Sequence, residues 1–133
     1  WDSALSPGGT GLRAFHPLVI ALASGANFVA REFSGNIKAC TQTIVEAVNH
    51  PGFSFVEILS PCVTFRPDEK EWKNQVHEAS VAETDDPARA ARRIMTDDGM
   101  NTGILYRGPR KPYSASVSDE VGDVSALEQF FEI

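Results

Sequence analysis

The sequence predicts an α/β fold, in which parallel strands alternate with flanking helices, and three observations support this class. The 133-residue chain contains stretches of helical periodicity, each followed by a short stretch of strand character. Residues 53–59 are rich in aromatic and β-branched side chains, as expected of a mostly buried parallel strand. A hydrophobic content of 42% is sufficient for one domain with a modest core.

The first part of the chain predicts a loop, a short helix and a short strand. Residues 1–14 are rich in glycine without regular apolar periodicity, and they lack the strand, Lys and Ser/Thr order of a phosphate-binding loop. Pro17 is suited to the first turn of a helix that ends near Gly25. Residues 27–31 then predict a strand.

The clearest predicted element is a helix that begins near Ile37. Asn36 precedes it as a capping residue, and residues 49–52 (Asn-His-Pro-Gly) form a strong stop signal. We therefore predict an amphipathic helix that leads into the strand at 53–59. Its apolar positions recur at steps of three and four residues, and they are Ile37, Cys40, Ile44, Val45 and Val48.

The second part of the chain is more charged and less regular. Residues 66–84 carry little apolar pattern and predict a surface excursion. Asp86 and Pro87 open a helix that ends before Gly99, and residues 101–107 predict another strand. Residues 114–133 predict an extended arm whose tip, apolar at Leu127, Phe130, Phe131 and Ile133, would need a partner surface to cover it.

Composition excludes some classes of function. A net charge of −6 and a pI near 5.0 argue against general nucleic-acid binding, which needs clustered Lys and Arg. No apolar run approaches the roughly 20 residues that span a bilayer, and the first residues lack a signal-peptide pattern. We therefore expect a cytoplasmic protein, and the opening on Trp1 rather than Met suggests a piece of a longer chain.

Cys62 is the residue whose position most favours chemistry. It follows the predicted strand at 53–59, at the carboxyl end, where open α/β sheets bind their ligands. A thiolate there could bind iron or zinc, act as a nucleophile, or only pack. Cys40, on the apolar side of the predicted helix, is interpreted as a packing residue. The basic residues Arg107, Arg110 and Lys111 are interpreted as solvated charge.

Three parts of the chain resemble the β subunits of 2-oxoacid:ferredoxin oxidoreductases. They are residues 21–36, residues 52–65 with the motif Ser60-Pro61-Cys62-Val63-Thr64-Phe65, and residues 101–107 with Lys111-Pro112-Tyr113. Their order and spacing match as well, so the resemblance covers about residues 8–113.

The resemblance implies an enzyme complex and a more specific fold. Members of the family oxidatively decarboxylate a 2-oxoacid with coenzyme A, using thiamine diphosphate and magnesium, and pass electrons through a 4Fe-4S cluster to ferredoxin. The expected fold is the carboxyl-terminal part of a thiamine-diphosphate-binding domain, with parallel strands, flanking helices and an extended C-terminal arm. Residues 1–65 would form the second part of that domain, and residues 66–133 the β-subunit extension and arm.

The resemblance also implies a role for two residues. Four Cys hold the family's cluster near thiamine, and the last of them matches Cys62, a ligand type that suits iron–sulfur clusters. Thr64 beside it would line the cofactor site. The other three Cys and the Gly-Asp-Gly segment that binds magnesium and pyrophosphate are absent from this sequence. We therefore assign no catalytic residue and expect the chain alone to be inactive.

The expected partners are the remainder of the β subunit, the α subunit and ferredoxin, with coenzyme A and a 2-oxoacid as substrates. Among 2-oxoacids, 2-oxoglutarate is favoured over pyruvate. Two alternatives stay open at this point, namely a non-catalytic assembly module and a fragment of an iron-free thiamine-dependent enzyme.

Overall fold

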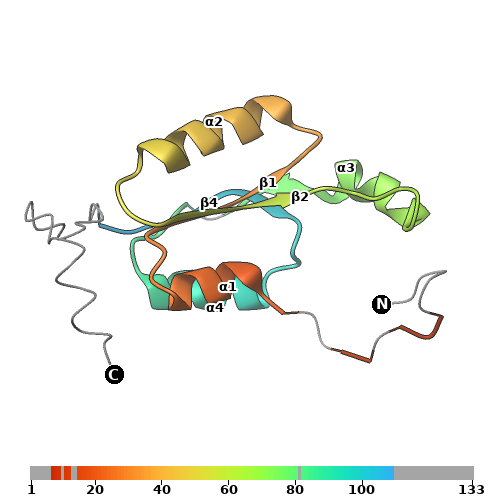
Figure 1. Ribbon diagram of the computed structural model, residues 1–133, viewed down its shortest axis with the longest axis horizontal. Helices are drawn as coiled ribbons and strands as arrows, with labels where there is room; N and C mark the ends of the chain where they lie inside the picture. The colour runs from red at the N-terminus through yellow and green to blue at the C-terminus, as the bar shows by residue number, and fades with distance from the viewer. Residues whose placement is uncertain (1–6, 10, 13–14, 81, 110–133) are drawn as a thin grey trace, which may run out of the picture.

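The computed structural model of the chain describes residues 7–9, 11–12, 15–80 and 82–109. A four-stranded sheet lies between two helical layers, with α2 on one face and α1 and α4 on the other (Figure 1). The strand order is β2-β1-β4-β3. In chain order the elements are α1 Pro17–Ala23, β1 Phe28–Phe33, α2 Ile37–Asn49, β2 Ser54–Leu59, η1 Pro67–Glu71, α3 Trp72–Gln75, β3 His77–Glu78, α4 Pro87–Thr96 and β4 Asn101–Arg107.

The unit β1–α2–β2 confirms the predicted alternation of strand and helix. β1 and β2 are parallel and in register from the pair Phe28 and Ser54 to the pair Phe33 and Leu59. Asn36 caps α2, since its side-chain oxygen accepts a hydrogen bond from the backbone N–H of Ala39 at 3.2 Å. All six residues of β1 are buried, which makes β1 the central strand of the packed part of the sheet.

The core has one part on each side of the sheet. Where α1 and α4 cover the sheet, the buried residues are Leu18, Ala21, Ala26, Val29, Ala90, Ile94, Leu105 and Tyr106. Beneath α2 the buried cluster is smaller and consists of Phe28, Ala30 and Ala47. The apolar contribution of α2 to the core is therefore small for a helix of 13 residues.

The second part of the chain adds a helix and a strand to the same sheet. Asp86 caps α4 by accepting hydrogen bonds from the backbone N–H groups of Ala88 and Arg89, as predicted. β4 has the predicted bounds, but it runs antiparallel to β1, so the sheet is mixed rather than purely parallel. Residues 66–84 are mostly exposed, and they contain the short elements η1, α3 and β3 that the charge pattern did not predict.

Burial in this chain differs in two places from the apolar pattern of the sequence. β2 is half-exposed rather than mostly buried, because it is an edge strand. On α2 the buried residues are Thr43 and Ala47, whereas most of the predicted apolar positions are exposed, namely Ile37, Ile44, Val45 and Val48. A periodic apolar pattern identifies a helix, but it does not identify which molecule covers the apolar face.

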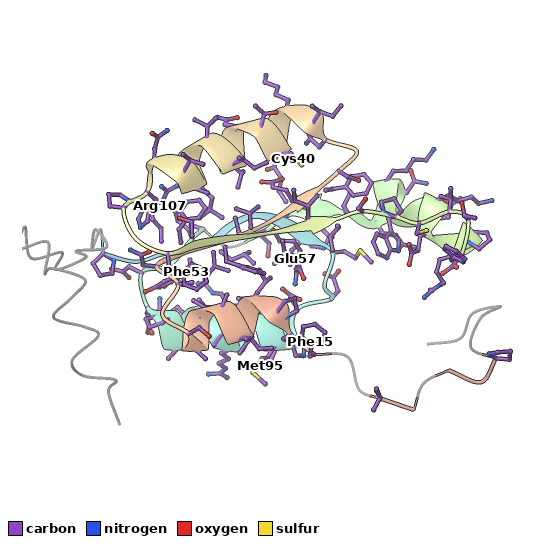
Figure 2. The ribbon with its side chains drawn as sticks, viewed as in Figure 1. Phe15, Cys40, Phe53, Glu57, Met95 and Arg107 are labelled. Carbon is purple, nitrogen blue, oxygen red and sulfur yellow. The ribbon has the colours of Figure 1, made fainter. Side chains whose placement is uncertain are left out.

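Arg107 also differs from its predicted role as solvated charge. It lies between the sheet and α2 (Figure 2), where its guanidinium bonds Glu46 at 2.6 Å and Glu83 at 2.9 Å. The hydrogen bond to Glu46 is the largest cause of the raised pKa of Arg107. The same group lies 5.1 Å from the centre of the Phe28 ring, within cation–π range.

The predicted arm at 114–133 lies outside the described residues, as do most of residues 1–14. No helix within the described part of the chain has the length and hydropathy needed to cross a membrane.

Candidate functional site

Cys62 lies just beyond the carboxyl end of β2, in the segment that extends past the sheet toward α3 (Figure 1). β2, which pairs in parallel with β1, ends at Leu59, so only Ser60 and Pro61 lie between the strand and Cys62. Its side chain is exposed and forms no disulfide. The structure thus places the predicted cysteine where a thiolate can reach a ligand outside the sheet.

The backbone of Cys62 is held on both sides. Its carbonyl oxygen accepts hydrogen bonds from the N–H groups of Phe65, at 3.2 Å, and Arg66, at 2.8 Å. Its own N–H donates to the Oε2 atom of Glu69 at 2.8 Å. Residues 62–69 therefore form a closed loop in which both backbone polar groups of the cysteine have partners.

Glu69 has the unusual environment in this loop. It is 8% exposed, whereas Cys62 and the residues of the following turn are exposed. Its Oε1 atom also lies 4.0 Å from the guanidinium of Arg66. Arg66 binds Asp68 more closely, at 2.7 Å, and this hydrogen bond lowers the pKa of Asp68 and raises the pKa of Arg66.

Thr64, the second residue predicted for the site, lies in the same turn as Cys62 and is exposed. The two side chains therefore belong to one short loop rather than to separate elements. A threonine hydroxyl can donate a hydrogen bond to a sulfur or phosphate ligand that approaches this loop.

Cys40 is confirmed as a structural residue. It lies on α2 toward the sheet (Figure 2), and its Sγ atom is 3.1 Å from the carbonyl oxygen of Phe33, to which it donates. Burial, assisted by the negative charge of Glu32, raises the pKa of the Cys40 thiol above its usual 9.0. A thiol that resists ionisation is a poor metal ligand.

The described residues could supply one ligand to an iron–sulfur cluster, but they do not form a complete metal site. Nowhere in the described ranges do three or more His, Cys, Asp or Glu side chains gather closely enough to hold a metal ion. Cys62 offers one exposed, soft sulfur ligand of the kind that iron–sulfur clusters take. Any further ligands would have to come from outside these residues.

Glu69 is the site residue that sequence reasoning did not identify. The charged run from Arg66 to Glu71 was interpreted as solvated surface, and most of it is. The only local signal is an acidic residue in the first turn of a short helix that follows the cysteine. That signal does not reveal that the loop folds back so that this carboxylate meets the amide of Cys62.

Together the fold and the site define an α/β domain that presents a cysteine at the carboxyl end of a parallel strand. Comparison with known proteins indicates the type of protein more closely, although no family model matches the chain. A 2-oxoacid:ferredoxin oxidoreductase subunit beta from Saccharolobus solfataricus is 29% identical over 119 residues, which cover 86% of this chain and 38% of that protein. Subunit beta of the 2-oxoacid:ferredoxin oxidoreductase 1 from Aeropyrum pernix is 26% identical over 113 residues, 74% of this chain and 36% of that protein.

A 2-oxoglutarate synthase subunit KorB from Archaeoglobus fulgidus is 39% identical over 59 residues, 44% of this chain and 22% of that protein. The resemblance found in the sequence is confirmed: the chain is similar to the β subunits of 2-oxoacid:ferredoxin oxidoreductases. It spans less than two-fifths of the length of these relatives.

A solved structure confirms the fold. It is the 2-oxoglutarate:ferredoxin oxidoreductase from Magnetococcus marinus with 2-oxoglutarate, coenzyme A and succinyl-CoA bound. The match has a TM-score of 0.76 and covers 100% of this chain and 50% of that chain, at 23% sequence identity. The mixed sheet with flanking helices is therefore the arrangement found in an oxidoreductase of this type.

Proposed function

We propose that this chain is the carboxyl-terminal part of the β subunit of a 2-oxoacid:ferredoxin oxidoreductase. Such an enzyme converts a 2-oxoacid and coenzyme A to an acyl-CoA and carbon dioxide, and it passes two electrons to ferredoxin. The observation that carries this proposal is the exposed Cys62 at the carboxyl end of β2, in a chain that aligns with a curated β subunit over 86% of its length. A soft ligand at this edge suits an electron-transfer cluster.

Within this proposal Cys62 would supply one of four thiolates to a 4Fe-4S cluster, and the chemistry of that cluster would be electron transfer. Thr64 lines the same site and can donate a hydrogen bond toward it. The role of this chain is to hold one ligand in a fixed loop, while thiamine diphosphate and magnesium are held by other parts of the enzyme. We assign no catalytic residue to this chain, and we expect it to be inactive alone.

The partner that the surface supports most directly is the remainder of the β subunit. A groove of about 560 Å³ between α2 and β2 is lined by apolar residues that include Ile44, Val48, Phe53 and Ile58. These four side chains are large and exposed, and β2 is an edge strand among the strands that the structure describes. An uncovered apolar surface beside a free strand edge favours association with more of the same sheet.

The α subunit and ferredoxin complete the proposed assembly, in which residues 1–65 and 66–133 form the domain part and the extension. Both parts contribute strands to one sheet in this chain. The relatives named for 2-oxoglutarate favour that substrate over pyruvate. The cytoplasmic location stays a prediction.

The test of the cluster role is Cys62→Ser in the complete enzyme. We expect loss of cluster iron and a fall of at least about tenfold in ferredoxin reduction, because even residues behind the ligands change metal affinity by that factor. Cys40→Ser is the matched control, since this thiol packs between α2 and the sheet. Full iron content and normal ferredoxin reduction in Cys62→Ser would contradict the proposal.

The exposed face of α2 also supports a second candidate, a non-catalytic assembly module in which Cys62 only packs. The same experiment separates the two candidates, because an assembly module has no iron to lose. An enzyme that retains thiamine-dependent decarboxylation but never contains iron would instead indicate the iron-free type.

A further inference from the structure

We propose that Glu69 is the positioning residue for Cys62: its carboxylate fixes the backbone amide of the cysteine, directs the thiolate toward the cluster and keeps the reduction potential of that cluster low. The inference rests on the proposed function. It adds a role for Glu69 and an effect on the reduction potential of the cluster. It starts from the 2.8 Å hydrogen bond between the Cys62 N–H and the Glu69 Oε2 atom.

Burial argues that this contact is more than a surface ion pair. Glu69 is 8% exposed in a loop whose other residues, with the exception of the half-buried Arg66, are exposed. A carboxylate removed from water needs strong donors to compensate for lost hydration, and a backbone N–H is such a donor. The bond spans seven residues, so it closes the loop that contains the cysteine.

The loop geometry then determines the direction of the side chain. Two N–H groups, from Phe65 and Arg66, hold the carbonyl oxygen of Cys62, and Glu69 holds its N–H. With both neighbouring peptide groups fixed, only rotation about the side-chain bonds remains for the Sγ atom. A ligand that is already oriented loses less entropy when it binds.

The same contact bears on the potential in two ways. Hydrogen bonds from backbone N–H groups to cluster sulfurs and the net charge nearby both set the reduction potential of iron–sulfur clusters. Glu69 takes the Cys62 N–H for itself, so that donor does not point at a sulfur. It also places a negative charge beside the ligand, which disfavours the reduced and more negative cluster. Both effects make the potential more negative.

The experiment uses the complete enzyme with Glu69→Gln and Glu69→Ala, and with Glu71→Gln as the matched control. Glu71 is exposed, bonds Asn74 and makes the same change of charge on the same segment. Glu69→Gln removes the charge but retains an acceptor oxygen, whereas Glu69→Ala removes both. The measurements are the cluster midpoint potential, by redox titration followed by electron paramagnetic resonance, and the rate of iron loss to a chelator.

We expect the potential to rise from wild type to Glu69→Gln and further to Glu69→Ala. Iron loss should accelerate about tenfold in Glu69→Ala and less in Glu69→Gln, given the strength of a charge-assisted hydrogen bond. Glu71→Gln should match wild type in both measurements. Variants of Glu69 that match Glu71→Gln in potential and in iron loss would overturn the proposal.

A measurement without iron separates this inference from the proposed function. In this chain, amide hydrogen exchange of Cys62 should be about tenfold faster in Glu69→Ala than in wild type. Unchanged exchange would show that Glu69 does not hold the amide and would overturn the positioning role. Faster exchange together with full iron content in Cys62→Ser would instead show that the loop is held as described and that the ligand role of Cys62 is wrong.

Discussion

Arg31 connects the first part of the chain, residues 1–65, to the second part, residues 66–133, through side-chain hydrogen bonds. It lies in the middle of β1, and its side chain is 7% exposed. Its guanidinium bonds Glu57 of β2 at 2.6 Å, Asp97 after α4 at 3.2 Å and the side chain of Asn101 in β4. One buried cation thus connects two strands of the sheet to the end of a helix.

Replacing Arg31 should therefore be costly. Arg31→Met retains most of the volume but leaves the half-buried carboxylates of Glu57 and Asp97 without their cation, so we expect a loss of about 3 kcal/mol in the free energy of unfolding. Urea unfolding followed by circular dichroism measures it. Arg92→Met on the exposed side of α4 is the control and should change stability by less than about 0.5 kcal/mol. A loss below 1 kcal/mol for Arg31→Met would refute this account.

For single residues, the sequence predicts where a residue lies in its element better than which side chain it pairs with. Cys62 could be placed at the end of a strand because the apolar run before it is local information. Arg31 and Glu57 are 26 residues apart, and Arg107 and Glu46 are 61 apart. Such pairs depend on strand register and helix placement, which a single sequence does not specify.

Among the elements, the junction between β3 and the end of α4 contains a histidine–carboxylate pair. The Nε2 atom of His77 lies 3.0 Å from the Oδ2 atom of Asp98, and both side chains are at least half exposed. This hydrogen bond is the largest cause of the raised pKa of His77, above 6.5, and of the lowered pKa of Asp98, below 3.8.

The sign of the pH effect follows from these two directions. The contribution of His77 is complete below about 6.5 and is lost as pH rises through its folded pKa. The contribution of Asp98 is present above about 3.8 and is lost as pH falls through its folded pKa. The pair should thus stabilise the junction most between these values. In an NMR titration, His77 should have its midpoint above 6.5. Asp98→Asn should lower that midpoint, and an unchanged midpoint would contradict the pairing.

Helix ends were predictable where their signals are local. Asp86 with Pro87 defined the start of α4, and residues 49–52 defined the end of α2. The buried face of α2 was not predictable, since Thr43 is buried by its 2.6 Å hydrogen bond to Glu32 and not by hydrophobicity. The direction of β4 was also beyond the sequence, because periodicity does not distinguish parallel from antiparallel strands.

For the whole molecule, the decisive feature is the uncovered face of α2 beside β2. Val48 is 79% exposed in this chain, so Val48→Glu should change the stability of this chain by less than about 0.5 kcal/mol. In the complete β subunit the same change should destabilise by about 2 kcal/mol or more, if the remainder of the subunit covers this face. Thermal unfolding of both forms measures the difference.

The control for this prediction is Gln42→Glu, which adds the same charge to α2 away from the groove. It should leave both forms unchanged. Equal effects of Val48→Glu in the chain and in the complete subunit would show that this face is not covered by the rest of the subunit.

The two edge strands of the sheet differ in length, since β2 has six residues and β3 has only two. Two copies that met through β2 would be related by a twofold axis, with antiparallel edge strands, and would cover each other's open edge. At the other edge β4 is flanked by β3 and by the bridge from Thr84 to Tyr106, so no long open edge would then remain for a third copy among the described strands. Misassembly through this surface would thus end as a closed pair rather than grow into a fibre.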